Sequence, residues 1–168
     1  RAASVAPVWQ EFADKYPTPE DCASAPPGEP EELIERLGLA WRAPLLRSLA
    51  QALSEPGAPP DGHAALQGLP GVGDYAAAAY RSLHAGRRAV IVDANVVRWI
   101  CRMTGDDWDG ETRRKPWLRE LAAEMTPRMT FRDYNYGVLD LTMTVCGRNP
   151  KCKECPVVTM CKTGSERD

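Results

Sequence analysis

Four cysteines close to the C-terminus have the residue type and the spacing needed to hold a metal centre. They follow the pattern C-x5-C-x2-C-x5-C, and Pro156 directly after the third cysteine stiffens the loop. Thiolates are the ligands that hold 4Fe-4S clusters. We therefore predict a 4Fe-4S cluster whose ligands are the four side chains of this pattern, Cys146, Cys152, Cys155 and Cys161.

Two other interpretations of the cysteine pattern stay open. A structural zinc ion usually takes two pairs of ligands separated by a longer stretch of chain. Two disulfides would need an oxidising compartment, but nothing at the N-terminus resembles a signal peptide, and Cys22 and Cys101 remain as free thiols. No apolar run approaches membrane-spanning length. We expect a protein of the cytoplasm, associated with the nucleoid in a bacterium or an archaeon.

The segment Leu69-Pro-Gly-Val-Gly73 predicts a tight turn between two helices. Gly71 and Gly73 permit backbone torsions and a close approach that a side chain would block. The amides of such a turn, with the positive end of the following helix dipole, can hold a phosphate without a lysine. This pattern is typical of a helix-hairpin-helix motif, which binds the DNA backbone without reading its sequence. A plain glycine-capped turn is the alternative.

A single carboxylate, Asp93, stands where an apolar run ends and the next helix begins, about twenty residues after Gly73. Aspartate is favoured as an N-cap because it accepts a hydrogen bond from a backbone N–H. Taken alone, the residue is best interpreted as a cap. A catalytic role requires support from the other parts of the chain.

The elements that must position these residues are helices. Apolar residues recur at spacings of three and four over several stretches separated by proline and glycine, and only residues 89–92 resemble a short strand. This periodicity predicts an all-α fold. The expected helices cover residues 4–16, 30–37, 42–54, 73–84, 93–103, 112–125 and 131–145. The aromatics expected to pack between them are Trp9, Trp99, Trp108 and Trp117.

Charge is unevenly distributed along the chain. The net charge is −2, yet residues 1–60 carry nine acidic and five basic side chains, whereas residues 81–119 carry nine basic and five acidic ones. The cysteine loop adds basic residues, namely Arg148, Lys151, Lys153 and Lys162. Such a chain can bind a polyanion on one face and stay soluble on the rest, although an ordinary solvated surface would show the same pattern.

The order of these parts resembles the endonuclease III and adenine glycosylase superfamily of DNA base-excision enzymes, over nearly the whole chain. The resemblance implies two helical lobes. One is a helical barrel that ends in the helix-hairpin-helix, here residues 1–86, and the other carries the iron–sulfur loop, here residues 87–168. It also implies that double-stranded DNA with a mismatched or damaged base binds between the lobes. We expect the protein to act as a monomer.

The resemblance assigns roles to three residues. The catalytic aspartate of the family corresponds to Asp93, and the partner asparagine of its monofunctional branches corresponds to Asn95. Bifunctional members have a lysine where this chain has Tyr75, and a phenol cannot form the imine with the sugar. The family chemistry then implies that Asp93 stabilises positive charge on the deoxyribose, that Asn95 orients this carboxylate or the water, and that Tyr75 lines the base pocket.

The same resemblance implies which residues contact DNA. The hairpin would hold the backbone. Trp41 lies where family members present a side chain that fills the space of the extruded base, although a core aromatic is the alternative. The predicted DNA contacts are Leu69, Gly71, Val72, Gly73, Trp41, Arg98, Arg148, Lys151 and Lys153.

Within the superfamily, Gly73-Asp-Tyr75 and Val92-Asp-Ala-Asn95 are most similar to the mismatch-specific thymine/uracil glycosylases. Adenine glycosylases usually have glycine in place of Ala94, and the glutamate with which they protonate the purine would precede Arg1. The resemblance thus favours a monofunctional glycosylase that removes thymine or uracil opposite guanine. An adenine glycosylase acting opposite guanine or 8-oxoguanine and a non-catalytic DNA-binding module remain as alternatives.

Overall fold

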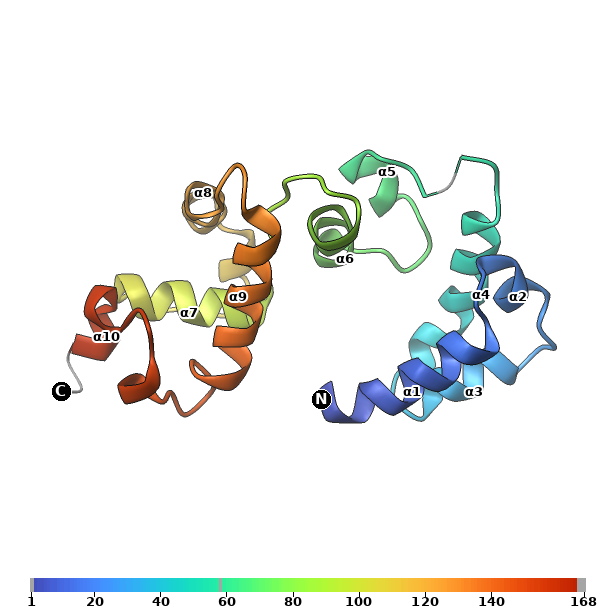
Figure 1. Cartoon of the computed structure of the whole chain (residues 1–168), viewed down its shortest axis with the longest axis horizontal. Coiled ribbons are helices and arrows are strands. Elements are labelled where there is room, and N and C mark those ends of the chain that lie inside the picture. The colour runs from blue at the N-terminus through green and yellow to red at the C-terminus, as the bar shows by residue number, and fades with distance from the viewer. Residues whose placement is uncertain (1, 58, 166–168) are drawn as a thin grey trace. The chain divides into compact units, whose positions relative to one another are not determined.

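The computed structural model of the chain describes residues 2–57 and 59–165. Within these ranges the chain forms helices and loops and no strand, which confirms the predicted all-α class (Figure 1). The chain divides into two compact units, an N-terminal unit of residues 1–74 and a C-terminal unit of residues 75–168. No helix in the described ranges has the length and apolar character needed to cross a membrane.

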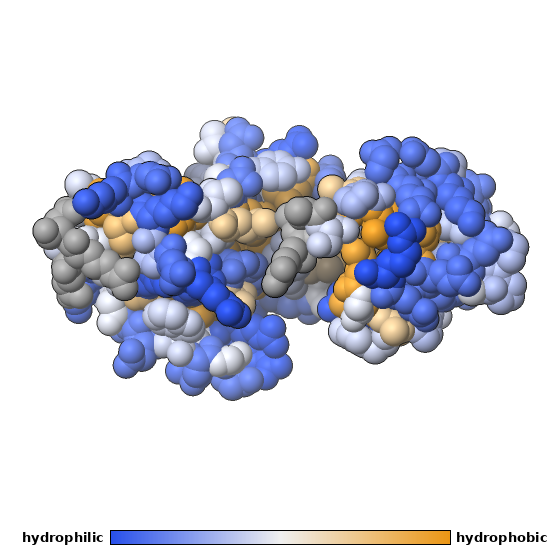
Figure 2. Space-filling view, turned by 90° about the horizontal axis from the view of Figure 1, so that it is seen from below, coloured by the Kyte–Doolittle hydropathy of each residue, from blue (hydrophilic) through white to orange (hydrophobic). Residues whose placement is uncertain are grey.

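Helices α1 to α5 and one 3₁₀ turn form the N-terminal unit. Helix α4 packs against both α2 and α3, and Arg47 of α4 donates to the carboxylate of Glu31 and to the Ala25 carbonyl. Hydrophobic residues also reach the surface of this unit, as at the right of Figure 2. The elements are α1 Ala2–Lys15, α2 Pro19–Ser24, α3 Glu29–Glu35, η1 Ala40–Arg42, α4 Ala43–Leu53 and α5 His63–Gln67.

The C-terminal unit is built around α7, which packs against α8, α9 and α10. Val96, Val97 and Ile100 on its buried face pack with Leu118 and Val138 from the neighbouring helices. Helix α6, Asp74–Ala79, begins at the last residue of the N-terminal unit and otherwise belongs to the C-terminal unit. The other elements of the C-terminal unit are the π-helical turn η2 Tyr80–His84, α7 Ala94–Thr104, η3 Thr112–Arg114, α8 Pro116–Met125, α9 Phe131–Thr144, η4 Cys152–Glu154, η5 Val158–Met160 and α10 Lys162–Ser165.

The two units meet in sequence at Asp74 and Tyr75, whereas the predicted boundary followed residue 86. A buried hydrogen-bond cluster accounts for the earlier division. The Asn135 side-chain nitrogen of α9 donates to Ser82 Oγ at 2.6 Å and to the Ala89 carbonyl at 3.0 Å. These bonds attach η2 and the segment before α7 to the C-terminal unit.

Candidate functional site

Asp93 is the N-cap of α7, and three hydrogen bonds hold its carboxylate. Oδ1 accepts from the backbone N–H groups of Asn95 at 2.9 Å and Val96 at 2.8 Å. Oδ2 accepts from the side-chain amide of Asn95 at 2.9 Å. The side chain is only partly buried. Asp93 is thus a helix cap, and Oδ2 can still accept a further contact because a carboxylate oxygen has two lone pairs.

Asn95 connects the carboxylate of Asp93 to the guanidinium of Arg98. The amide nitrogen of Asn95 donates to Asp93, and its amide oxygen accepts from Arg98 Nη1 at 3.0 Å. Since both ends of the amide are engaged, the network fixes which end faces the carboxylate. The structure therefore brings together the aspartate and the asparagine that the sequence singled out.

Tyr75 lies in the first turn of α6 and is 44% exposed. Partial burial of its phenol raises the pKa of Tyr75 above the ordinary value, and the negative charge of Asp93 raises this pKa further. A raised pKa keeps the phenol protonated at neutral pH, so that it can donate a hydrogen bond.

Arg98 was predicted to contact DNA, but the structure places its guanidinium against the protein backbone. Nε and Nη2 donate to the Cys146 carbonyl at 3.1 and 2.8 Å, and Nη2 also donates to the Thr142 carbonyl at 2.9 Å. Burial lowers the pKa of Arg98, and the positive charge of Arg102 adds to this effect. We therefore assign Arg98 a positioning role, since it links Asn95 to the start of the cysteine loop.

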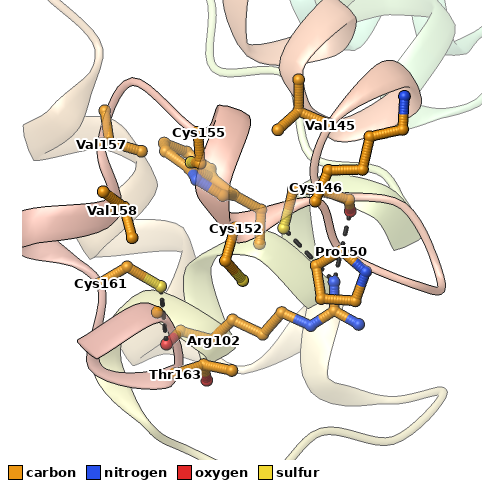
Figure 3. A pocket seen from close by; sticks show the side chains of 13 residues that line it. Arg102, Val145, Cys146, Pro150, Cys152, Cys155, Val157, Val158, Cys161 and Thr163 are labelled. Atoms are coloured by element: carbon orange, nitrogen blue, oxygen red, sulfur yellow. Dashed lines mark hydrogen bonds between the residues drawn. The ribbon is translucent and has the colours of Figure 1, made fainter. Parts of the chain in front are cut away.

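The four predicted ligand cysteines line one cavity in the C-terminal unit (Figure 3). Apolar side chains, including Val145 and Val157, form much of the remaining wall. The two cysteines outside this cavity, Cys22 and Cys101, are both buried. In the described ranges no three Cys, His, Asp or Glu side chains gather closely enough to hold a single metal ion.

Arg102, which sequence reasoning missed, holds the first turn of the cysteine loop. Its Nη1 donates to the Gly147 carbonyl at 2.6 Å and lies 3.4 Å from Cys146 Sγ, and Nη2 donates to the Arg148 carbonyl at 3.0 Å. Arg102 follows Arg98 by four residues, and this spacing places both on one face of α7. That spacing is the sequence signal that could have identified Arg102.

The hairpin of residues 68–73 joins α5 to α6, as a helix-hairpin-helix motif requires. Gly71 has a φ of +73°, and a Cβ there would lie 3.3 Å from Leu45 Cβ of α4. Both the torsion and the close approach predicted for this glycine are confirmed. For Gly73 the predicted torsion is wrong, because its φ is not positive, and a Cβ there would meet no described atom of the chain. The close approach of DNA to Gly73 stays a prediction.

The other predicted DNA contacts are accessible to different degrees. Trp41 is 67% exposed, and the Arg42 guanidinium lies 4.6 Å from its ring centroid, so the alternative of a core aromatic is wrong. Arg148 and Lys153 are exposed, while Lys151 lies 3.7 Å from the Glu154 carboxylate. The partly buried residues of this set are Leu69 and Val72, in the hairpin.

Comparisons with known proteins agree with this arrangement. Residues 1–124 match the family described as HhH-GPD superfamily base excision DNA repair protein. A thymine/uracil-DNA glycosylase of Methanothermobacter thermautotrophicus is 35% identical over 164 residues, which cover 95% of this chain and 74% of that protein.

Two solved structures have the same fold. A thermostable thymine-DNA glycosylase matches with a TM-score of 0.86 and 34% identity, over 98% of this chain and 78% of that one. A trapped endonuclease III–DNA covalent intermediate matches with a TM-score of 0.82 and 27% identity, over the same shares of the two chains. Because sequence and fold agree over nearly its whole length, this chain belongs to the HhH-GPD superfamily of base excision DNA repair proteins.

Proposed function

We propose that this protein is a monofunctional DNA glycosylase of base excision repair that hydrolyses the N-glycosidic bond of thymine or uracil opposite guanine. The observation that carries the proposal is the Asp93 carboxylate, held at the start of α7 by the Asn95 side chain and by two backbone amides. The choice of base is supported by relatives that are thymine/uracil-DNA and thymine-DNA glycosylases.

The chemistry needs a negative charge fixed beneath a sugar ring. Cleavage of an N-glycosidic bond builds positive charge on the deoxyribose, and a carboxylate held in place stabilises it without having to reorganise. The hydrogen bonds from Asn95 and Val96 fix the Asp93 carboxylate before substrate binds. A mismatched pair costs less to open than a matched pair, and this difference contributes to selectivity.

Tyr75 determines how the reaction ends. A phenol cannot form an imine with the sugar, so strand cleavage by that route is not available to this protein. Because its raised pKa keeps Tyr75 protonated, the hydroxyl can donate to the departing base or to a nearby phosphate. The expected product is therefore an intact strand that carries an abasic site.

The cysteine cavity fits an iron–sulfur cluster by the chemistry of its donors. Cys146, Cys152, Cys155 and Cys161 would hold it, and the Arg102 guanidinium lies 3.4 Å from Cys146 Sγ. A single zinc ion would need all four sulfurs about 2.3 Å from one point, whereas a cube-shaped cluster takes each thiolate on a different iron. A bound 4Fe-4S cluster supplies a one-electron centre and a rigid link between four chain positions.

A panel of duplexes tests the proposed activity. Each carries one T:G, U:G, A:G or A:8-oxoguanine pair and is treated with and without alkali after incubation. We expect cutting of the T:G and U:G strands only after alkali. Cutting of the adenine strands alone would instead support an adenine glycosylase, and intact strands under tight DNA binding would support a non-catalytic module.

The metal is tested separately by its content and colour. A yellow-brown protein that absorbs broadly near about 400 nm, with iron and acid-labile sulfide, would support the cluster. A colourless protein with stoichiometric zinc would overturn it.

A further inference from the structure

One buried polar atom in the C-terminal unit lacks a partner. Trp99 of α7 is 5% exposed, and its indole Nε1 is buried without a hydrogen-bond partner among the residues that the structure describes. Buried N–H groups in native proteins are nearly always paired. The expected role of Trp99 as a packing aromatic accounts for the ring but not for this N–H.

Trp99 lines the same cavity as the four ligand cysteines. The charged side chains that line this cavity, those of Arg102 and Lys151, are donors and cannot accept from an indole. Most of the other lining side chains are apolar. Besides the Thr163 hydroxyl, which makes no hydrogen bond to the indole, the side-chain acceptors on this wall are the four cysteine sulfurs and any group bound between them.

We propose that the Trp99 Nε1–H donates a hydrogen bond to a sulfur of the iron–sulfur cluster and thereby tunes its reduction potential. The inference rests on the 4Fe-4S assignment made under the proposed function. Hydrogen bonds to the sulfurs stabilise the more negative, reduced form of a cluster, so they raise its potential. Arg102 Nη1, 3.4 Å from Cys146 Sγ, is positioned to act in the same direction.

The holoprotein and its Trp99→Phe variant provide the test. Phenylalanine keeps one aromatic ring in the core and removes the N–H together with part of the indole volume, a loss that the control substitution shares. The matched control is Trp117→Phe, because Trp117 lies on α8, is 37% exposed and does not line the cysteine cavity. The first measurement is the midpoint potential of the cluster. The second is pulsed EPR on a paramagnetic state of the cluster, with 15N-labelled indole in the tryptophans.

We expect the midpoint potential of the cluster in Trp99→Phe to be more negative than in the wild type by about 59 mV. For a one-electron couple this equals a roughly tenfold lower ratio of reduced to oxidised cluster at the same ambient potential. The control should keep the wild-type potential. A coupling between indole 15N and the cluster spin should be present in the wild type and the control and absent from Trp99→Phe.

Several results would overturn the inference. An unchanged potential in a Trp99→Phe protein with full iron and sulfide would do so, and the cluster assignment would survive. Absence of the coupling between indole 15N and the cluster spin in the wild-type protein would also overturn the inference and would indicate water as the acceptor. This measurement does not depend on whether the variant folds. Zinc in place of iron would remove both the cluster and the inference, while glycosylase activity on the duplex panel is decided independently.

Discussion

Asp93 meets two requirements with one side chain. Its Oδ1 satisfies two backbone amides at the start of α7, and its Oδ2 is oriented by Asn95. The interpretation of the residue as a simple cap and the catalytic interpretation therefore do not exclude each other. The cap provides the rigidity that electrostatic catalysis needs, because a carboxylate already fixed does not have to reorganise when charge develops.

Replacing Asp93 with Asn separates these two requirements. Asparagine caps helices about as well as aspartate, so we expect thermal stability to change by less than about 1 kcal/mol. Loss of the charge should slow excision by at least about 100-fold, the scale found when a preorganised electrostatic group is removed. Single-turnover cleavage and DNA-binding assays check both parts.

The control for this substitution is Asp21→Asn, which changes the N3 aspartate of the capping box at the start of α2, in the N-terminal unit. It should leave the excision rate unchanged. An Asp93→Asn variant that still excised the base at the wild-type rate would contradict the enzymatic role and leave Asp93 as a cap alone.

The pKa of Tyr75 should respond to the same Asp93→Asn change. Burial and the charge of Asp93 both raise this pKa above 10.0. Without the negative neighbour, phenolate formation becomes easier, so the pKa should fall relative to wild type but stay above the ordinary value because burial persists. Tyr134 is the control, since burial alone raises its pKa. An NMR titration of 13C-labelled tyrosine should show a lower pKa for Tyr75 in Asp93→Asn than in the wild type, and the same pKa for Tyr134 in both proteins.

The secondary-structure elements were largely predictable from hydrophobic periodicity. Each of the seven predicted helical stretches overlaps a helix of the structure. The predicted stretches omit α2 and α10, which have six and four residues and are too short to show a period. The five-residue α5 was expected only as the helical turn before the hairpin. Residues 89–92, the one strand-like stretch, lie in an extended segment without strand pairing.

The site was predictable in part, and the reason is physical. A cap such as Asp93 and a glycine turn such as that at Gly71 are local features, which the neighbouring sequence specifies. The roles of Arg98, Arg102 and Asn135 depend on carbonyls and hydroxyls that are 44 to 53 residues distant in sequence. No local pattern indicates such partners, and arginine-rich stretches suggest DNA contacts instead.

The two hairpin glycines should respond differently to alanine. Gly71→Ala places a Cβ at a positive φ and against Leu45, so it should cost about 1–2 kcal/mol of stability and weaken DNA binding. At Gly73 the φ is not positive, and an added Cβ would meet no described atom of the chain, so Gly73→Ala introduces neither strain nor a clash within the protein. We expect it to keep wild-type thermal stability and to lose DNA affinity, because the added methyl group would meet the DNA backbone. Wild-type affinity of Gly73→Ala would contradict a close approach there.

The link from α7 to the cysteine loop can be tested by Arg98→Lys. One ammonium group cannot replace a guanidinium that bonds Asn95 and two carbonyls, so unfolding free energy should fall by about 1–3 kcal/mol. Excision should slow as well, since Asn95 loses its anchor. Arg88→Lys is the control, because Arg88 donates to carbonyls at the end of α8. It should lower stability similarly and leave excision intact.

For the whole molecule, a net charge of −2 does not oppose DNA binding because the charges are segregated along the chain. Arg148 and Lys153 are exposed, and no ion pair is found for either in the described part of the chain. If they bind phosphates, the slope of log affinity against log salt should shrink by about 0.9 for each residue replaced with Gln. Affinity should fall equally for matched and mismatched duplexes.

The control for the salt dependence is Arg36→Gln, because Arg36 is paired with Glu11 in the acidic N-terminal unit. This variant should keep the wild-type slope. Equal slopes for all variants would instead show that the cysteine loop does not contact the DNA backbone.

The position of Asp93 at the beginning of a helix also has an evolutionary consequence. A gene copy released from selection for repair would still be restricted there to Asp, Asn, Ser or Thr, because folding needs a cap. We expect substitutions in such a copy to accumulate first at position 95, because the side-chain amide of Asn95 bonds only other side chains, those of Asp93 and Arg98. Directed-evolution libraries face the same asymmetry, so randomising position 95 should yield many folded proteins with altered turnover, whereas randomising position 93 should mostly lower stability, by about 1 kcal/mol.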